Sequence, residues 1–121
     1  MPAASASEIQ IVGLFRSRCR TLCPAVSVVA IPNAAKRTQW AAQRAKREGM
    51  ATGFPDLMVL APGKIAFLEM KTAKGRVSEA QGEWLDRLHG MGFPCGVFRD
   101  ADRAIEFLRE QGFPFIGRIS G

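Results

Sequence analysis

The sequence predicts an α/β fold, in which a mixed central β-sheet is flanked by helices. Strand-like and helix-like segments alternate along the chain, which is typical of a sheet covered by helices. The dipeptide Pro62-Gly63 separates two apolar runs, so these runs are expected to pair as a hairpin, which makes the predicted sheet a mixed one. The 121 residues, 47% of them hydrophobic and 23% charged, match one globular domain over 1–121.

The first half of the chain is predicted to contain a helix, a strand and a second helix. Ser5-x-x-Glu8 has the spacing of a capping box. The β-branched run 25–31 predicts a strand with at least one buried face. The second helix, over 36–48 with Gly49 after it, has a basic face and an alanine face thin enough to pack closely on a sheet. The apolar positions of the first helix, which Pro24 ends, are Ile9, Val12, Phe15, Cys19 and Leu22.

The second half is predicted to contain the hairpin, a helix, a short strand and a last helix. Ser78-x-x-Gln81 is a second capping box, and Asp100 or Asp102 is the expected cap of the last helix. The predicted ranges are 56–61 and 64–71 for the hairpin strands, 72–77 for a basic loop, 78–91 for the helix, 95–98 for the strand, and a last helix that reaches residue 110.

The charge balance favours a polyanionic partner. The chain has 17 Lys and Arg against 11 Asp and Glu, a net charge of +6, which attracts nucleic acid. The alternative is a basic surface that only keeps the protein soluble. No apolar run is long enough to cross a bilayer and the amino terminus lacks the features of a signal peptide, so we expect a soluble cytoplasmic protein with no membrane partner.

The three cysteines fit a reducing compartment. Cys19 and Cys23 lie four residues apart on the first predicted helix, a spacing from which a metal or redox pair is conceivable. No histidine or third cysteine is near them in the sequence, so buried thiols are favoured over a zinc site.

The register of the hairpin brings charged residues together. If Pro62 and Gly63 are the loop residues, Asp56 lies opposite Glu69, and Lys71 projects from the same face. Cβ atoms of opposed residues are about 5 Å apart, and two carboxylates this close repel unless a cation such as Mg²⁺ or Mn²⁺ lies between them. The alternative is a partly exposed Glu69–Lys71 ion pair, with Asp56 capping a strand. A slip of one residue would turn Asp56 to the other face.

These residues resemble a known nuclease signature. Gly53-Phe54-Pro55-Asp56 followed by Glu69-Met70-Lys71 resembles the PD-(D/E)XK motif, and the wider pattern resembles its small, stand-alone virus-type replication-repair nuclease (VRR-NUC) branch over about residues 5–98. The resemblance implies a restriction-endonuclease-like core. The further matching positions are Glu8, Pro32-Asn33, Arg37, Gly49, Gly75, Ser78-x-x-Gln81 and Trp84.

The resemblance also implies a function and roles for the residues. It implies a Mg²⁺- or Mn²⁺-dependent DNA endonuclease of a bacterial or phage-infected cell, selective for branched DNA such as four-way junctions or flaps. Asp56 and Glu69 would bind the metal together with the Met70 carbonyl, and Lys71 would hold the attacking water. Glu8 either completes the metal shell or only belongs to the capping box.

Gln81 also has two interpretations. The resemblance places it in the catalytic set, pointing toward the site from the start of its helix. The alternative is that Gln81 serves only as the capping-box partner of Ser78.

The DNA-contacting surface is expected on the second helix and on the loop after the hairpin. A solvated charged face is the alternative for the helix, and a simple turn is the alternative for Asn33. Trp40, within the basic face, is expected to pack against a subunit, a neighbouring loop or a base. The candidate residues are Asn33, Lys36, Arg37, Arg44, Arg47, Lys74 and Arg76.

Two further hypotheses concern activity and assembly. The rival to a nuclease is a non-catalytic nucleic-acid-binding module on a nuclease fold, and a sequence-specific restriction enzyme is a weaker rival. Because cleavage of two strands needs two sites, we expect a homodimer. Its interface is expected at 113–116, although this segment could instead pack back on its own sheet.

Overall fold

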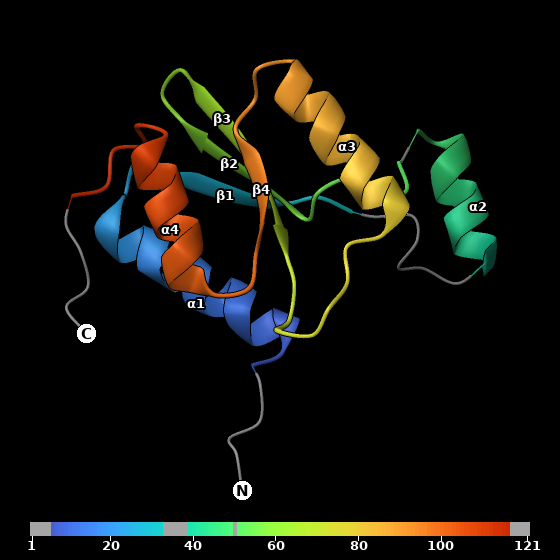
Figure 1. Ribbon diagram of the computed structural model, residues 1–121, viewed down its shortest axis with the longest axis horizontal. Helices are drawn as coiled ribbons and strands as arrows, with labels where there is room; N and C mark the ends of the chain where they lie inside the picture. Colours follow the sequence, from blue (N-terminus) through green and yellow to red (C-terminus); the bar gives the residue numbers. More distant parts are fainter. Residues whose placement is uncertain (1–5, 33–38, 50, 117–121) are drawn as a thin grey trace, which may run out of the picture.

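The computed structural model describes residues 6–32, 39–49 and 51–116, and its elements follow the predicted order (Figure 1). The predicted strand 95–98 is confirmed residue for residue, and other predicted ranges differ at their ends by a few residues, while the predicted start of the second helix at 36 lies outside the described residues. The elements are α1 (Glu8–Leu22), β1 (Ser27–Ala30), α2 (Gln39–Arg47), β2 (Leu57–Ala61), β3 (Lys64–Met70), α3 (Glu79–Gly90), β4 (Cys95–Phe98) and α4 (Ala101–Glu110).

The four strands form one mixed sheet in the order β1-β2-β3-β4. β2 pairs antiparallel with both β1 and β3, whereas β3 and β4 are parallel and are connected through α3. The hairpin has the predicted register, with Ala61 opposite Lys64 and Leu57 opposite Leu68. The mixed sheet flanked by helices is therefore confirmed.

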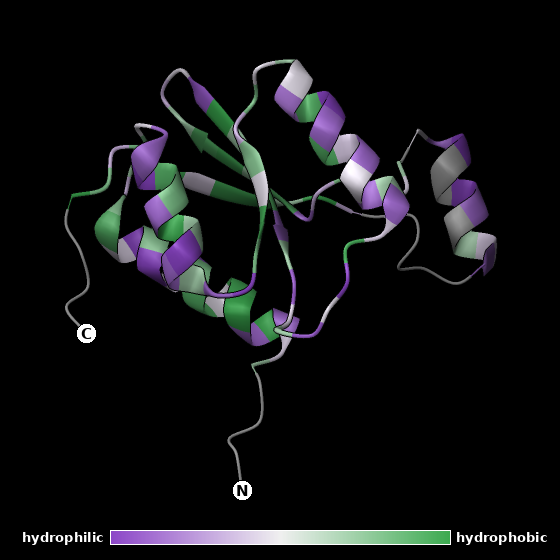
Figure 2. Cartoon of the chain, in the orientation of Figure 1, coloured by the Kyte–Doolittle hydropathy of each residue, from purple (hydrophilic) through white to green (hydrophobic). Residues whose placement is uncertain are grey.

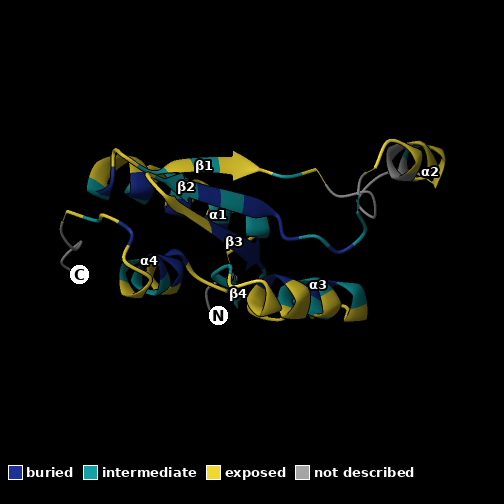
Figure 3. Ribbon diagram, turned by 90° about the horizontal axis from the view of Figure 1, so that it is seen from above, coloured by how far each residue is buried: buried dark blue, intermediate teal, exposed yellow. Residues whose placement is uncertain are grey.

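The main hydrophobic core lies between the sheet and the helix pair α1 and α4. Alternate residues of β3, Ala66, Leu68 and Met70, face this core, because successive side chains of a strand point to opposite faces. Figure 3 shows the buried residues concentrated in β2, β3 and the inner sides of the helices. Other core members are Ile11, Phe15, Cys19, Leu57, Val59, Ala101, Ala104, Ile105, Leu108 and Phe113.

A smaller aromatic cluster connects α3 with the opposite face of β3. The ring of Phe67 lies 5.5 Å from that of Phe54 and 5.7 Å from that of Phe93, and Phe54 lies 5.0 Å from Trp84 of α3. These edge-to-face contacts fix α3 and the segment before β2 against β3. Trp84 is half-buried in this cluster.

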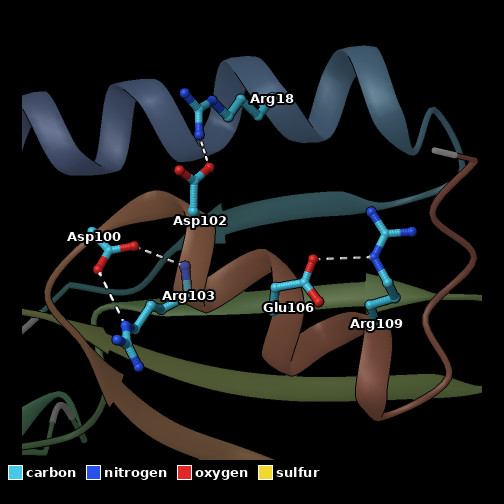
Figure 4. A network of polar contacts seen from close by, with 6 residues as sticks. All are labelled: Arg18, Asp100, Asp102, Arg103, Glu106 and Arg109. Carbon is cyan, nitrogen blue, oxygen red and sulfur yellow. Dashed lines mark hydrogen bonds and ion pairs between the residues drawn. The ribbon is translucent and has the colours of Figure 1, made fainter. Parts of the chain in front are cut away.

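Polar contacts connect α4 with α1 and cap its start (Figure 4). Asp100, one of the two predicted caps, accepts a hydrogen bond from the Arg103 backbone N–H at 2.8 Å, whereas Asp102 forms an ion pair with Arg18 of α1. Along α4, the Arg109 Nε lies 3.6 Å from the Glu106 Oε1, which makes an ion pair within the helix. The cap and the interhelical ion pair together orient α4 beneath the sheet.

The start of α1 differs from the prediction. The capping box uses Ser7 and Gln10: the Ser7 hydroxyl accepts from the Gln10 N–H, and the Gln10 side chain accepts from the Ser7 N–H at 2.8 Å. The predicted box of Ser5 and Glu8 is therefore wrong, and Ser5 lies outside the described residues. Because the helix begins two residues later than expected for an Ser5 cap, Glu8 stands in its first turn and takes no part in the box.

The predicted apolar face of α1 is also shifted at its start. Ile9 is 85% exposed, and Ile11 is buried in its place. Ile11, Phe15 and Cys19 recur every four residues and define the buried stripe. Glu8 precedes Ile11 by three residues, so it continues this stripe at the end of the helix nearest the charged residues of the hairpin.

Helix α2 lies outside the sheet layers. Figures 1 and 3 show it beyond the first turn of α3, away from the face that its alanines were expected to cover. Ala41 is half-buried, and the side chains of Ala42 and Ala45 lie outside the described set. The described residues of this helix are largely hydrophilic (Figure 2).

The segment after α4 packs back onto its own core. Phe113 is 4% exposed, and Phe115 packs against the core with the Arg109 guanidinium 5.5 Å from its ring centre. The Ile116 N–H donates to the Leu22 carbonyl at 2.7 Å, and the Ile116 side chain is exposed. Phe113 and Phe115 therefore follow the alternative prediction, in which this segment packs back on its own chain.

The cysteines are free thiols. The Cys23 thiol donates to the Pro114 carbonyl, and burial raises the pKa of Cys19 to about 12, so both thiols stay protonated near neutral pH. Cys19 and Cys23 are both buried, in agreement with the prediction of buried thiols. None of the described helices combines the length and apolar character that a membrane span needs.

Candidate active site

Three carboxylates meet at the end of the sheet where β2 begins and β3 ends. Asp56 directly precedes β2, Glu69 is near the end of β3, and Glu8 is in the first turn of α1. An oxygen atom of each lies within 4.8 Å of an oxygen of the other two. Asp56 is only 9% exposed and Glu69 only 1%, so two of the three acids are buried.

The backbone of β3 and β1 holds Asp56 in place. Its Oδ2 accepts a hydrogen bond from the Met70 N–H at 3.2 Å, and its carbonyl accepts from the Ile31 N–H at 2.7 Å. The first contact joins the two chains of the hairpin just beyond the Leu57–Leu68 pair, where Asp56 was predicted to lie beside Glu69. Strand pairing therefore brings Asp56 and Glu69 together.

The segment before Asp56 fits tightly against the start of α3. Gly53 has a φ of +84°, and a Cβ atom at this position would lie 2.7 Å from the Ala80 carbonyl carbon and 2.8 Å from the Gln81 nitrogen. A glycine is needed here for its conformation and for the close approach of two backbones. Phe54, packed between Phe67 and Trp84, anchors the next residue, and Pro55 is buried.

Lys71 follows β3 and is half-buried. Its N–H donates to the Phe98 carbonyl at 3.0 Å, so the backbone still runs beside β4 at this residue. Because Lys71 is two residues after Glu69, extended backbone directs both side chains to the same face of the sheet. The side-chain stem of Lys71 packs on Gly75, where a Cβ atom would lie 3.4 Å from the Lys71 Cδ.

Gln81 forms the predicted capping box. Its side-chain oxygen accepts from the Ser78 N–H at 2.8 Å, and its own N–H donates to the Ser78 hydroxyl at 3.1 Å. The residue is buried, and the backbone of Gly53 lies against its N–H group. The capping role of Gln81 is therefore confirmed, and its role in catalysis stays a prediction.

The chemistry of the carboxylate cluster suits a hard divalent cation. Mg²⁺ and Mn²⁺ prefer oxygen ligands, and buried carboxylates that crowd together are stabilised by a cation between them. Glu8, Asp56 and Glu69 supply such oxygens from three separate elements. The residues present therefore fit a divalent metal ion, and sequence spacing alone could not place Glu8 among them.

The predicted DNA-contacting residues fall into three groups. Arg44 and Arg47 are exposed on α2, and Lys74 and Arg76 are exposed on the loop between β3 and α3. Asn33, Lys36 and Arg37 lie outside the described residues. On α2, Trp40 is 67% exposed, and the Arg44 guanidinium lies 5.8 Å from its ring centre.

One residue near the site escaped the sequence analysis. Arg99, directly after β4, donates through Nη1 to the carbonyls of Thr72 and Gly75 at 2.7 Å and lies 3.4 Å from that of Ala73. No motif signals this contact, because it joins residues more than twenty positions apart. The pairing of β4 beside β3 could have indicated only that Arg99 lies near the loop after β3.

The fold and the comparisons with known proteins identify the class and the family. The mixed sheet with its helices is consistent with a restriction-endonuclease-like fold. A solved structure named "VRR_NUC domain protein" matches with a TM-score of 0.68 and 18% identity over 88% of each chain, which shows the shared fold. The VRR-NUC domain model matches residues 11–102, so the chain belongs to this nuclease-type family. No curated protein matches the sequence.

Proposed function

We propose that residues 1–121 form a single nuclease domain that hydrolyses phosphodiester bonds of DNA with the help of Mg²⁺ or Mn²⁺. The observation that carries this proposal is the cluster of Glu8, Asp56 and Glu69 at the end of the hairpin, with Lys71 directly after β3. Membership of the VRR-NUC family supports the nuclease activity, and the net charge of +6 supports a nucleic-acid substrate.

The roles of the residues follow from their chemistry. Glu8, Asp56 and Glu69 would hold the metal. The Met70 carbonyl would assist them, since the Met70 N–H already faces the Asp56 carboxylate. A bound divalent ion neutralises phosphate charge and lowers the pKa of water. The Lys71 ammonium would orient the attacking water and offset charge that develops on the phosphate.

Gln81 is proposed to complete the catalytic set from the start of α3. Its side chain also accepts the capping hydrogen bond from the Ser78 N–H. The position of Gly53 against Ala80 and Gln81 supports this proposal, because it ties the start of α3 to the segment that leads into Asp56. Replacing Gln81 would remove both roles at once, so Asp56 and Glu69 give the cleaner test.

A cleavage assay tests the proposed function. Purified protein should cut DNA in Mg²⁺ or Mn²⁺, lose this activity in a chelator and regain it when the metal is restored. Ca²⁺ should support DNA binding with little turnover. Duplex, flap and four-way-junction substrates of equal length should be compared, and we expect the branched ones to be cut fastest. Absence of cleavage on every substrate, with DNA binding intact, would favour a non-catalytic binding module.

The exposed arginines of α2 are proposed to contact phosphates of the DNA, together with Asn33, Lys36, Arg37, Lys74 and Arg76. Replacing Arg44 and Arg47 by Ala should weaken binding and reduce the salt slope by roughly 0.9 per lost phosphate contact. The fold should persist, because both side chains are exposed. The slope is measured from binding titrations at several salt concentrations, and an unchanged slope would assign DNA contact to the 74–76 loop instead.

A homodimer is proposed as the working unit on branched DNA. The described residues of one chain contain one carboxylate cluster of this kind, whereas a junction has two strands to cut. A two-fold axis would present two sites in opposite polarity, as antiparallel strands require. Sedimentation at micromolar concentration, with and without junction DNA, should show twice the 13.2 kDa chain mass. A persistent monomer would indicate a nickase that acts on one strand at a time.

A further inference from the structure

The loop between β3 and α3 carries exposed basic residues and follows Lys71 directly. It leaves β3, passes beside the start of α1 and turns up to α3 (Figure 1). Its own backbone provides one turn, closed by the Gly75 N–H and the Thr72 carbonyl at 3.1 Å. One such hydrogen bond is a weak restraint for a surface loop.

Arg99 supplies the missing restraint from outside the loop. Its Nη1 group donates to two carbonyls at 2.7 Å, those of Thr72 and Gly75, with Ala73 as a more distant third acceptor at 3.4 Å. A charged donor makes these hydrogen bonds stronger than those between neutral groups. The two close acceptors are the first and last residues of the turn, so Arg99 closes it from outside.

The loop in turn packs against Lys71. Gly75 lies on the Lys71 side chain, with only 3.4 Å between the position of a Cβ atom and the Lys71 Cδ. By fixing the Gly75 carbonyl, Arg99 therefore also fixes the backbone against which the Lys71 side chain packs. In addition, the Lys71 backbone N–H donates a hydrogen bond to the carbonyl of Phe98, the residue before Arg99. The end of β4 thus fixes Lys71 by two routes, directly through the Phe98 carbonyl and indirectly through the Arg99 side chain and the loop.

We propose that Arg99 is a positioning residue: it holds the loop of residues 72–75 so that Lys71 is directed at the phosphodiester. The proposal rests on the proposed nuclease function, in which Lys71 is a catalytic residue. In this role Arg99 acts through the loop and does not contact the DNA. Its replacement should therefore lower kcat and leave KM and DNA affinity little changed.

The test compares Arg99→Ala, Arg99→Gln and Arg99→Lys with wild type. Arg103→Ala is the matched control, because Arg103 is an exposed arginine four residues away whose loss removes the same charge. Cleavage kinetics should show kcat lowered about tenfold or more in Arg99→Ala and Arg99→Gln at similar KM. Arg99→Lys should recover part of the rate, since an ammonium group can also donate to several carbonyls. Arg103→Ala should match wild type.

A second measurement needs no activity. Trypsin cleaves after lysine and arginine, and Lys74 and Arg76 are exposed in the loop. Releasing the loop should raise the rate of nicking at these residues roughly fivefold in Arg99→Ala, with no change in Arg103→Ala. Melting temperatures show whether each variant is folded, and Arg99→Lys provides the comparison if Arg99→Ala is not.

The outcomes separate the two proposals. If wild type does not cleave DNA, the nuclease function fails, while the trypsin measurement still reports whether Arg99 holds the loop. Nicking at the wild-type rate in Arg99→Ala would overturn the positioning role. So would an unchanged kcat despite faster nicking, or a raised KM at unchanged kcat, which would make Arg99 a DNA contact.

Discussion

Replacing Glu69 by Gln is expected to reduce DNA cleavage by roughly a thousandfold or more. The amide has nearly the same shape as the carboxylate but lacks the charge that attracts a divalent ion. Glu69 is 1% exposed and lies beside Asp56 and Glu8, so its loss removes one of the three acids of the cluster. Asp56→Asn should have a similar effect, and Lys71→Ala should also abolish cleavage.

Two controls make this result specific. Glu110→Gln removes the same charge from an exposed position at the end of α4 and should leave cleavage unchanged. DNA affinity of Glu69→Gln, measured in a chelator, should equal that of wild type, since the basic surface is intact. Mg²⁺ should raise the melting temperature of wild type but not of Glu69→Gln, because only a protein that binds the ion is stabilised by it. Near-normal cleavage by this variant would exclude the proposed metal site.

The hairpin could be predicted from the sequence because its register depends on local information. A two-residue Pro62-Gly63 loop sets the pairing, and the period of two along each strand then brings Asp56 beside Glu69. The same reasoning placed Lys71 on the strand face of Glu69. Elements bounded by clear caps, such as α3 with Ser78 and Gln81, were also predicted with small errors.

The remaining features depend on choices that local patterns leave open. Both Ser5 and Ser7 are followed three residues later by a suitable partner, Glu8 or Gln10, so the sequence offered two competing capping boxes. The structure uses Ser7 and Gln10, and Glu8 belongs to the carboxylate cluster instead. Counting back from Phe15, helical spacing allows either Val12 and then Ile9 at steps of three, or Ile11 at a step of four, which explains why Ile9 was expected inside in place of Ile11.

Long-range packing decided the other differences. The alanines of α2 suggested contact with a sheet, yet the helix stands beyond α3, and Val29 of β1 stays exposed. The turn of the chain after α4 directs Phe113 into the core, and a sequence of apolar residues could not distinguish this from an interface. The role of Arg99 could not be predicted either, because its hydrogen-bond acceptors are backbone carbonyls of a distant loop, and these leave no signal in the sequence.

Gly53→Ala is expected to lower the free energy of unfolding by about 2–4 kcal/mol, combining an unfavourable positive φ with a steric overlap. The overlap is with the backbone of Ala80 and Gln81, which belongs to the capped first turn of α3 and cannot move aside without breaking the cap. Urea denaturation followed by tryptophan fluorescence should show the lower midpoint at an unchanged slope. The shift should also displace Asp56, three residues later, and lower the cleavage rate of the folded protein.

Two other glycines separate the causes of this loss. Gly63 in the hairpin turn also has a positive φ, +71°, but an added Cβ would meet no atom within 4 Å, so Gly63→Ala should cost only the conformational part, about 1 kcal/mol. Gly82 lies within α3, again with open space around it, and Gly82→Ala should stabilise the protein by up to about 1 kcal/mol. If Gly53→Ala and Gly63→Ala were equally mild, the close backbone contact with α3 would not hold Asp56. The difference in unfolding free energy lost between Gly53→Ala and Gly63→Ala therefore measures the contribution of the close fit between this segment and the first turn of α3, the fit that positions Asp56.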